Sequence, residues 1–387
     1  MTGAEVVPYE IATPESDLED LRDRLRRTRW PERETVDDWS QGVPLDYLQE
    51  LCRYWAEDYD WRRVEDRLNG WPHFRTEIDG LGLHFLHVRS PHPEAVPLVM
   101  THGWPGSVIE FLDVIGPLTD PPAYGGDAAD AFHLVCPSLP GYGFSDKPRQ
   151  PGWGVDRIAN AWARLMKRLG YDRYGAQGGD WGTSVSTELA LHHPERIIGL
   201  HLNPPLAPPD PDTFDDLTEQ EQRALDSLQH AQEWEDGYSA EQSTRPQTIG
   251  YALVDSPVAL CAWIVEKFRA WTDCDGTPEN ALTRDQMLDD ITLYWLTGTG
   301  ASSARLYWES IRSVQQIFTS SAPETVSVPT GCSLFPAETI RPSRRWAAKR
   351  FTDIRFWHEL DRGGHFGAFE QPELFVADVR DFFRQVR

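Results

Sequence analysis

The feature that most constrains this chain is a glycine-flanked acid, Asp180, in the sequence Gly-Gly-Asp-Trp-Gly at residues 178–182. A short apolar run precedes this stretch and a helical pattern follows it, which predicts a strand that turns sharply into a helix. Such a turn lifts one side chain off the backbone. Gly178 and Gly182 stand where a Cβ would clash with the neighbouring strand and helix. The pattern therefore predicts that the Asp180 carboxylate is held out at the end of a strand.

An aspartate in this position is a candidate nucleophile. A carboxylate that attacks carbon leaves a covalent ester, and this chemistry suits an electrophilic sp3 carbon, as in an epoxide or an alkyl halide. A glycine-rich turn with a capping aspartate explains the same five residues equally well. The choice between the two interpretations depends on the rest of the chain.

Composition narrows the class of protein. With 387 residues, the chain is expected to form one large α/β domain with an added domain. Its net charge of −24 and its isoelectric point of about 4.8 argue against nucleic acid and anionic membrane surfaces as partners. The acidic residues are spread along the chain, so we interpret them as a source of solubility. Lysine is scarce beside abundant arginine, which is typical of a high-GC bacterial coding sequence.

The ends of the chain and its cysteines bear on location. The first ten residues have neither the basic nor the apolar run of a signal peptide, and no run approaches the ~18 apolar residues of a membrane span. The five cysteines are scattered and include no C-x-x-C pair, which predicts neither a disulfide framework nor a zinc site. We therefore expect a cytoplasmic protein with reduced thiols, no metal or other cofactor, and no membrane partner.

Helical and strand patterns divide the chain into four parts, at residues 1–90, 91–204, 205–323 and 324–387. The first part holds Trp-rich helices followed by the first strands. The second and fourth parts alternate strands with helices, which predicts an α/β fold with a mostly parallel sheet and helical crossovers. The third part is helical, and we expect it to form a cap, or lid, over the carboxyl ends of the strands.

Periodicity and turn residues place the expected elements. Leucines at helical spacing predict a helix over residues 15–30. Residues 74–78 and 83–88 alternate like the strands of a hairpin joined at Asp79-Gly80. After the cap, the sheet is expected to resume at residues 325–332. Further strands are expected at residues 97–101, 132–136, 171–176, 197–202 and 353–357.

A carboxylate nucleophile needs a base that activates water. His365, in the sequence Arg-Gly-Gly-His-Phe, falls on the loop after the last predicted strand, where the chain order nucleophile, acid, histidine puts such a base. The acid that orients the base should follow a late strand. We choose Glu338, in Phe-Pro-Ala-Glu, over Asp353 and Asp361, although a charge near the start of a helix explains Glu338 as well.

The remaining roles are oxyanion donors and a proton donor. The backbone N–H groups of Trp181, after the nucleophile, and of Trp104, in the sequence His-Gly-Trp-Pro after the third predicted strand, are candidates for the oxyanion hole. An epoxide oxygen is a poor leaving group and needs a hydroxyl donor, such as a tyrosine of the cap. Periodicity does not choose among the four candidates, and each could simply be a core residue. They are Tyr238, Tyr251, Tyr294 and Tyr307.

Taken together, these segments resemble the microsomal-type and juvenile-hormone-type epoxide hydrolases, which have the α/β-hydrolase fold. The resemblance covers nearly the whole chain, and residues 4–110 are similar to the N-terminal domain of that family. The chain begins almost at the globular part and so looks like a soluble bacterial relative. The motifs that carry the resemblance lie at residues 102–107, 137–145, 178–182, 335–338 and 362–366.

The resemblance implies roles that spacing alone could not assign. Asp180 would be the nucleophile, His365 the base and Glu338 its charge partner. Tyr238 and Tyr307 match the two cap tyrosines that donate protons to the epoxide oxygen in the family. The resemblance also implies a cis bond between Trp104 and its proline.

Two other functions fit parts of the pattern. A haloalkane dehalogenase uses the same aspartate, and the indole N–H of Trp181 could then bind halide, but a halide needs no tyrosine pair. A non-catalytic small-molecule receptor shares the fold. It has no need for the combination of Asp180, Glu338 and His365.

The expected partners are a small-molecule epoxide and water, and the family resemblance makes a homodimer worth testing. Aromatic residues of the cap suggest an apolar substrate, with aryl epoxides as candidates, although the same rings could pack the cap onto the core. A bacterial source would fit secondary metabolism, such as antibiotic biosynthesis, as well as detoxification. These aromatic residues are Trp263, Phe268, Trp271, Trp295 and Trp308.

Overall fold

The computed structural model describes residues 5–320 and 324–387. Within them, nine strands form one sheet in the order β1-β2-β3-β5-β4-β6-β7-β8-β9. The pairs from β1 to β5 are antiparallel, and the pairs from β5 to β9 are parallel. The mostly parallel sheet of the predicted α/β fold is therefore confirmed. The strands are β1 (Val7–Tyr9), β2 (His73–Ile78), β3 (Leu81–Val88), β4 (Val96–Thr101), β5 (Phe132–Pro137), β6 (Tyr174–Gly179), β7 (Ile197–Asn203), β8 (Thr330–Leu334) and β9 (Ile354–Glu359).

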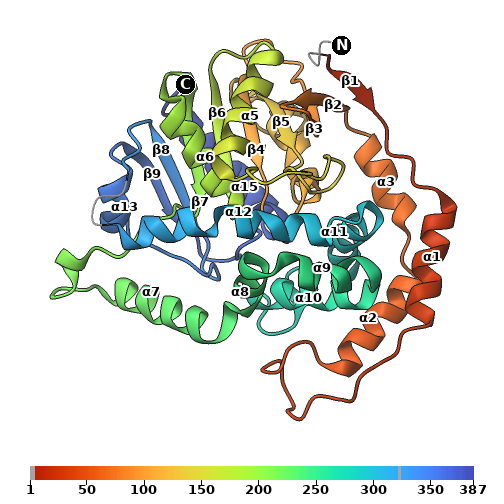
Figure 1. The fold of residues 1–387 in the computed structure, drawn as a ribbon. Helices are drawn as coiled ribbons and strands as arrows, with labels where there is room; N and C mark the ends of the chain where they lie inside the picture. The colour runs from red at the N-terminus through yellow and green to blue at the C-terminus, as the bar shows by residue number, and fades with distance from the viewer. Residues whose placement is uncertain (1–4, 321–323) are drawn as a thin grey trace.

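Helices flank the sheet, and the helical insertion lies beneath it in the view of Figure 1. The N-terminal helices are α1 (Glu15–Arg26), α2 (Leu45–Glu57) and α3 (Trp61–Asn69). The core helices are α4 (Leu112–Thr119), α5 (Val155–Arg168), α6 (Trp181–His192), α13 (Arg344–Arg350), α14 (Gly367–Glu370) and α15 (Pro372–Phe383). The cap helices are α7 (Glu219–His230), α8 (Gly237–Thr244), α9 (Pro246–Asp255), α10 (Pro257–Trp271), α11 (Arg284–Thr297) and α12 (Gly300–Thr319).

The sequence explains where several cap helices begin and end. Thr218 and Thr283 start α7 and α11 with reciprocal capping boxes, to Glu221 and Gln286 respectively. Gly298 ends α11 in the left-handed conformation that glycine adopts at little cost. The cap is thus divided into short helices by residues that also fix their directions.

Several predicted elements differ from the structure, and the strand expected at residues 171–176 is β6, Tyr174–Gly179. The helix expected over residues 15–30 ends at Arg26, directly after Leu25, the last of its buried leucines, while Pro31 restricts only Trp30. Strand β1 was missed, since three residues carry too little pattern, and the His-Gly-Trp-Pro loop therefore follows the fourth strand. The strand expected from residue 325 begins at Thr330, and before it only Val326 bridges to Phe351. Residues 1–4 and 321–323, at the outer ends of the predicted first and third parts, lie outside the described residues.

The N-terminal helices attach to the cap as well as to the sheet. The Trp55 indole N–H donates to the Thr292 hydroxyl at 2.9 Å, and the Tyr59 hydroxyl donates to Asp289 at 2.8 Å. Arg63 donates to the same Asp289 carboxylate at 2.6 Å. Helix α11 of the cap is therefore fastened to the segment that comes first in the chain, and Figure 1 shows the two side by side.

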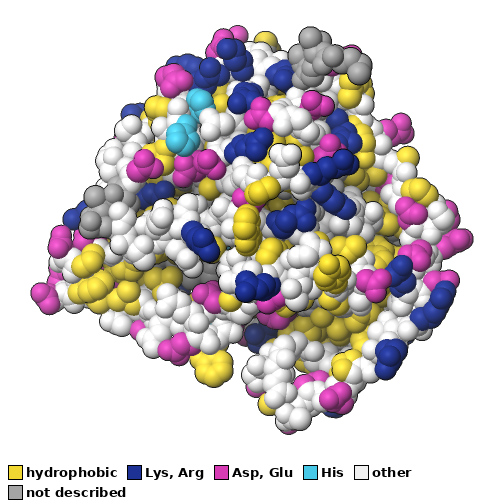
Figure 2. All heavy atoms as spheres, viewed as in Figure 1, with side chains coloured by type: hydrophobic (Ala, Val, Ile, Leu, Met, Phe, Trp, Pro, Cys, Tyr) yellow, Lys and Arg dark blue, Asp and Glu magenta, His cyan; other side chains and the backbone are white. Residues whose placement is uncertain are grey.

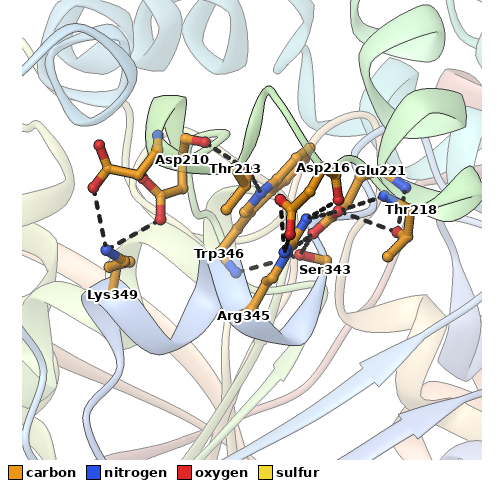
Figure 3. Close-up of polar contacts among 10 residues, drawn as sticks. Asp210, Thr213, Asp216, Thr218, Glu221, Ser343, Arg345, Trp346 and Lys349 are labelled. Carbon is orange, nitrogen blue, oxygen red and sulfur yellow. Dashed lines mark hydrogen bonds and ion pairs between the residues drawn. The ribbon is translucent and has the colours of Figure 1, made fainter.

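A second attachment joins α7 to α13 of the core (Figure 3). Glu221 of α7 has no exposed surface and accepts hydrogen bonds from Arg345 to both carboxylate oxygens, at 2.6 and 2.5 Å. The Ser343 hydroxyl donates to it at 2.6 Å, and Asp216 adds a second acid for Arg345. The bond from Arg345 is the main reason why the pKa of Glu221 falls to about 2. We call Glu221, Arg345, Ser343 and Asp216 the α7 clamp.

The acidic side chains and the cysteines are distributed as the composition predicts. Figure 2 shows acidic side chains scattered over one face rather than gathered in one patch. All five cysteines are buried and free. Across residues 5–320 and 324–387, no single helix has the length and apolarity needed to cross a membrane, while the bent pair α9–α10 meets that test by length and composition alone.

Candidate active site

Residues 178–182 form the predicted turn between β6 and α6. Asp180 lies between the two elements with φ 51°, a region that L-residues with a side chain rarely occupy. A Cβ on Gly178 would lie 2.0 Å from the Gly182 carbonyl oxygen, and a Cβ on Gly182 would lie 1.9 Å from the Thr101 carbonyl oxygen. Only glycine fits at both positions, so the tight packing of strand and helix holds Asp180 in its strained conformation.

The loop after β4 approaches the Asp180 carboxylate from the other side. The Trp104 backbone N–H donates to Asp180 Oδ1 at 2.7 Å. A Cβ on Gly103 would lie only 2.1 Å from that same oxygen. Gly103 therefore has a functional role that the sequence analysis did not assign. The feature that could have identified it is its position directly before Trp104. The peptide bond between Trp104 and Pro105 is cis, as the resemblance implied.

His365 and Glu338 complete a chain of three groups. His365 Nε2 lies 3.3 Å from Asp180 Oδ2, and His365 Nδ1 lies 2.9 Å from Glu338 Oε1. The Thr339 N–H donates to the same Glu338 oxygen at 2.8 Å and fixes its direction. The rejected acid Asp353 instead pairs with a neighbouring arginine on the surface.

The charges around His365 set its protonation. Burial opposes a charge on the imidazole, but the carboxylates of Glu338 and Asp180 outweigh burial and raise the pKa of His365 well above its ordinary value. The histidine therefore holds its proton more tightly than a free imidazole does while it lies between Glu338 and Asp180. Losing the charge of either neighbour would make His365 a better base for water.

Two of the four cap tyrosines lie over this triad. The Tyr238 ring stacks on the Trp104 ring with centroids 5.1 Å apart and planes within 8°, and the Tyr307 ring meets the Trp181 ring edge-on at 4.8 Å. The Tyr238 and Tyr307 rings are 5.7 Å apart. Burial, reinforced by the charge of Asp180, raises the pKa of both tyrosines. Both hydroxyls therefore stay protonated and able to donate.

The other two tyrosines lie elsewhere. Tyr251 is 70% exposed, and the Tyr294 hydroxyl donates to the Gly106 carbonyl oxygen at 2.9 Å. The sequence could not make this choice, because α8, α9, α11 and α12 each carry one of the four tyrosines and only the tertiary packing decides which of them face Asp180.

The cap aromatics separate into site and packing residues. Trp271 contacts both His365 and Tyr238, with ring centroids 4.9 and 5.2 Å apart. Phe268 packs against Phe366, beside the site rather than in it. The other three lie apart: Trp308 is half exposed, Trp295 stacks with Arg24, and Trp263 donates to Gln242.

One further residue near the site was not foreseen. The Lys267 ammonium is buried and lies 4.5 Å from the centroid of the Tyr238 ring, and it pairs with Glu266 at 2.5 Å. A cation over an aromatic face stabilises the ring in place. Lys267 therefore holds Tyr238 against Trp104, and the only signal in the sequence was the rarity of lysine in this chain.

The site offers hydrogen-bonding and acid–base groups rather than metal ligands. No group of three or more His, Cys, Asp or Glu side chains within the described ranges is arranged to hold a metal ion. What the arrangement can do chemically is attack carbon with Asp180, donate protons from two tyrosines, and activate water with His365.

Comparisons with known proteins bear on the family and the fold. Residues 6–111 match the family described as epoxide hydrolase N terminus, and residues 96–248 match the family described as alpha/beta hydrolase fold. The predicted fold is thus confirmed.

Individual relatives cover nearly the whole chain. A protein of Stigmatella aurantiaca, provisionally named an epoxide hydrolase, is 56% identical over 99% of this chain and 86% of its own length. Epoxide hydrolase 1 of Sus scrofa is 37% identical over 97% of this chain and 88% of its own. The crystal structure of juvenile hormone epoxide hydrolase from the silkworm Bombyx mori superposes with a TM-score of 0.88 at 32% identity, over 98% of this chain and 95% of that one.

Proposed function

This chain belongs to the epoxide hydrolases of the α/β-hydrolase fold, and we propose that it opens its epoxide through a covalent ester on Asp180. The observation that supports this mechanism is the shared environment of the Asp180 carboxylate, with the Trp104 N–H at 2.7 Å and His365 Nε2 at 3.3 Å. No hydroxyl or thiol stands at the elbow, so the carboxylate itself is the nucleophile.

In the first step, Asp180 attacks one epoxide carbon and the carbon–oxygen bond of the ring breaks. Both tyrosine hydroxyls, of Tyr238 and Tyr307, bind the leaving oxygen, and one of them gives it a proton. The tyrosine that has lost its proton then takes the proton of His365. The products are a hydroxyalkyl ester and a neutral histidine. Proton donation at this point matters because an unassisted alkoxide is a poor leaving group.

The first step prepares the second. Esterification removes the negative charge of Asp180, one of the two charges that raise the pKa of His365. The histidine becomes a competent base while Glu338 still orients it. It takes a proton from water, which attacks the ester carbonyl, and the backbone N–H groups of Trp104 and Trp181 stabilise the oxyanion. Trp181 is the first residue of α6, where N–H groups lack intrahelical partners.

Intact-mass spectrometry tests this scheme with two variants. Asp180→Ala should form no adduct with an epoxide such as styrene oxide. His365→Gln should accumulate an adduct of one substrate mass, because the ester forms and is not hydrolysed. Equal loss of activity in both variants without a trapped adduct would contradict the two-step scheme.

A second candidate function rests on one observation. The Trp181 indole N–H is buried and has no hydrogen-bond partner among the described residues, as a halide ligand would require. We rank a haloalkane dehalogenase lower because two buried, protonated tyrosines face the same carboxylate. Halide release without diol, measured side by side on a 1-haloalkane and an aryl epoxide, would reverse this order. Binding of either compound without turnover would favour a receptor.

The finer assignments rest on composition and on one tryptophan. Trp271 is the cap aromatic that reaches both His365 and Tyr238, which supports an apolar, and in particular an aryl, epoxide. A cytoplasmic location, and a role in antibiotic biosynthesis or in detoxification, remain predictions from the sequence alone.

A further inference from the structure

A basic groove lies where the cap meets the core, outside the site around Asp180. It has a volume of about 830 Å³ and forms between the β2–β3 turn, the loop after β5, the start of α5 and the cap helix α12. Figure 2 shows several Lys and Arg side chains close together on this face, above α12. The basic residues that line the groove are Lys147, Arg149, Arg157 and Arg305. In a chain with a net charge of −24, such a local excess of positive charge needs an explanation.

The two acidic residues of the groove are already paired with arginines outside its lining. Asp146 accepts a hydrogen bond from Arg75 at 2.6 Å, and Asp79 pairs with Arg164. Asp79 also lies 3.9 Å from Arg157. These two carboxylates therefore neutralise little of the positive charge in the groove.

The other three cations have no acidic partner. Lys147, Arg149 and Arg305 form no ion pair within 4.0 Å in the part of the chain that the structure describes. Arg305 is half-buried and donates a long hydrogen bond of 3.4 Å to the Pro148 carbonyl oxygen. Glu309 attracts Arg305 from a distance, but its carboxylate accepts from a backbone N–H of the segment before α5. All three charges are thus available to an anion.

Lys147 and Arg305 lie close enough to disfavour each other's charge. Partial removal of its ammonium group from water, together with the charge of Arg305, lowers the pKa of Lys147. Burial lowers the pKa of Arg305 as well. An anion between the two groups would stabilise both charged forms. Lys147 is exposed at the rim, so a ligand can reach it from solvent, and a cleft lined by one sign of charge concentrates counter-ions.

The charges and the size of the groove indicate the class of ligand. A phosphate monoester carries roughly −1.5 to −2 charges in one place at pH 7, which matches two neighbouring cations. The arginine fork fits phosphate oxygens, and Arg157 is held at the wall by stacking on Trp153 at 4.3 Å. A volume of about 830 Å³ is far larger than a phosphate ion needs and lies within the ~300–1,000 Å³ of small-molecule sites. The groove therefore fits an organic phosphate better than a bare ion.

We propose that this groove binds the phosphate group of a small organic molecule through Lys147, Arg149 and Arg305, and that the bound molecule fastens the cap to the core. The inference goes beyond the epoxide chemistry and does not depend on the ester at Asp180. Lys147 and Arg149 belong to the core loop after β5, whereas Arg305 belongs to α12 of the cap. One ligand that contacts all three bridges the two parts of the molecule.

The loop and the helix already touch beside the groove. The Ser302 hydroxyl donates to the Gly141 carbonyl oxygen at 2.5 Å, and the Tyr142 hydroxyl donates to the Ser303 carbonyl oxygen at 3.2 Å. A ligand on Arg305 adds a third connection along the same helix. Binding should therefore slow hydrogen exchange across the first turns of α12.

Isothermal titration calorimetry at low salt tests the proposal with glycerol 3-phosphate, adenosine 5′-diphosphate, inorganic phosphate and citrate. The tighter of the two organic phosphates should bind with a Kd below about 1 mM, at least about tenfold more tightly than inorganic phosphate or citrate. Arg305→Met should weaken this binding at least about tenfold, because a charge-assisted hydrogen bond is lost. Lys147→Met, at an exposed position, should weaken it at least about fivefold without changing the melting temperature of the unliganded protein.

The control is Arg355→Met, which removes one positive charge from β9, at the opposite edge of the sheet, and should bind like the unchanged protein. Equal weakening in this control would show a general effect of charge and overturn the proposal. Binding of inorganic phosphate or citrate as tight as that of the organic phosphates, or no binding of any probe, would overturn it too. Lys147→Met should form diol from styrene oxide at the unchanged rate when no phosphate is present. A loss of that activity would make the groove part of the active site rather than a separate one.

Discussion

At the scale of single residues, the site depends on how closely backbone atoms can approach Asp180. Gly103 is the clearest case, because a Cβ there would meet the carboxylate oxygen at 2.1 Å. The clash includes the Asp180 Cβ at 2.4 Å, which side-chain rotation cannot move, so Gly103→Ala should displace the turn that carries Asp180 as well as its carboxylate. We expect kcat/KM to fall at least about 100-fold and the melting temperature to fall as well. Gly237→Ala, whose Cβ would meet nothing within 4 Å, is the matched control. Equal activity of the two variants would contradict this account.

The charge on His365 gives a second prediction at this scale. Hydrolysis of the ester needs neutral His365, so its rate should rise with pH through the pKa of the histidine in the ester. Glu338 is the first of the two carboxylates that raise this pKa. Glu338→Gln should therefore move the acidic limb of the profile to lower pH while lowering the plateau about 100-fold. The rate of ester decay in single turnovers, measured from pH 5 to 9, gives both the position of the acidic limb and the height of the plateau. An acidic limb that stays in place would show that Glu338 does not set the charge of His365.

At the scale of elements, the α7 clamp decides how the first cap helix stays on the core. Replacing Arg345 by Met would leave the buried Glu221 carboxylate without its main partner. Hydrogen exchange across α7 should become at least about tenfold faster, while the central strands keep their protection. The control is Arg355→Met, which removes an exposed ion pair with Asp353 and should leave the hydrogen exchange of α7 nearly unchanged. If α7 and the core exchange faster together, the clamp supports global rather than local stability.

The same clamp predicts a dependence on pH. The pKa of Glu221 is about 2 in the folded protein, below the ordinary value of about 4.3. A lowered pKa contributes stability that is present above about pH 4.3 and is lost as the pH falls towards 2. Protection of α7 should therefore decrease between pH 4.5 and 2.5, and Glu221→Gln should remove most of this dependence. A variant that keeps the full pH dependence would assign it to another acid.

At the scale of the whole molecule, the thiols report on packing. All five cysteines are buried and free, including Cys136 and Cys332 in the sheet. The native protein should react slowly with a thiol reagent, and five thiols should react in denaturant with or without prior reduction. Burial also raises the pKa of Cys136 and Cys332, which slows any reaction further. Fast labelling of the native protein would show that the core opens readily.

The sequence predicts features that local patterns determine, but not those that contacts between distant segments determine. The elbow, the alternation of strands and helices and the loops that hold Trp104 and His365 follow from local patterns of glycine, proline and apolar residues. Lys267 could not be found this way. Its importance comes from a contact between segments distant in the chain, since Lys267 of α10 lies against Tyr238 of α8. The three-residue strand β1 escaped because a short edge strand leaves almost no periodicity.

The strained turn at Asp180 has an evolutionary consequence. Its backbone conformation is fixed by Gly178, Gly182 and the strand behind them, none of which depends on the nature of the side chain at the tip. A descendant could exchange the carboxylate for a hydroxyl or a thiol without rebuilding the scaffold. The electrophile that such a lineage attacks can then change by substitution at one codon, while selection on the glycines preserves the framework.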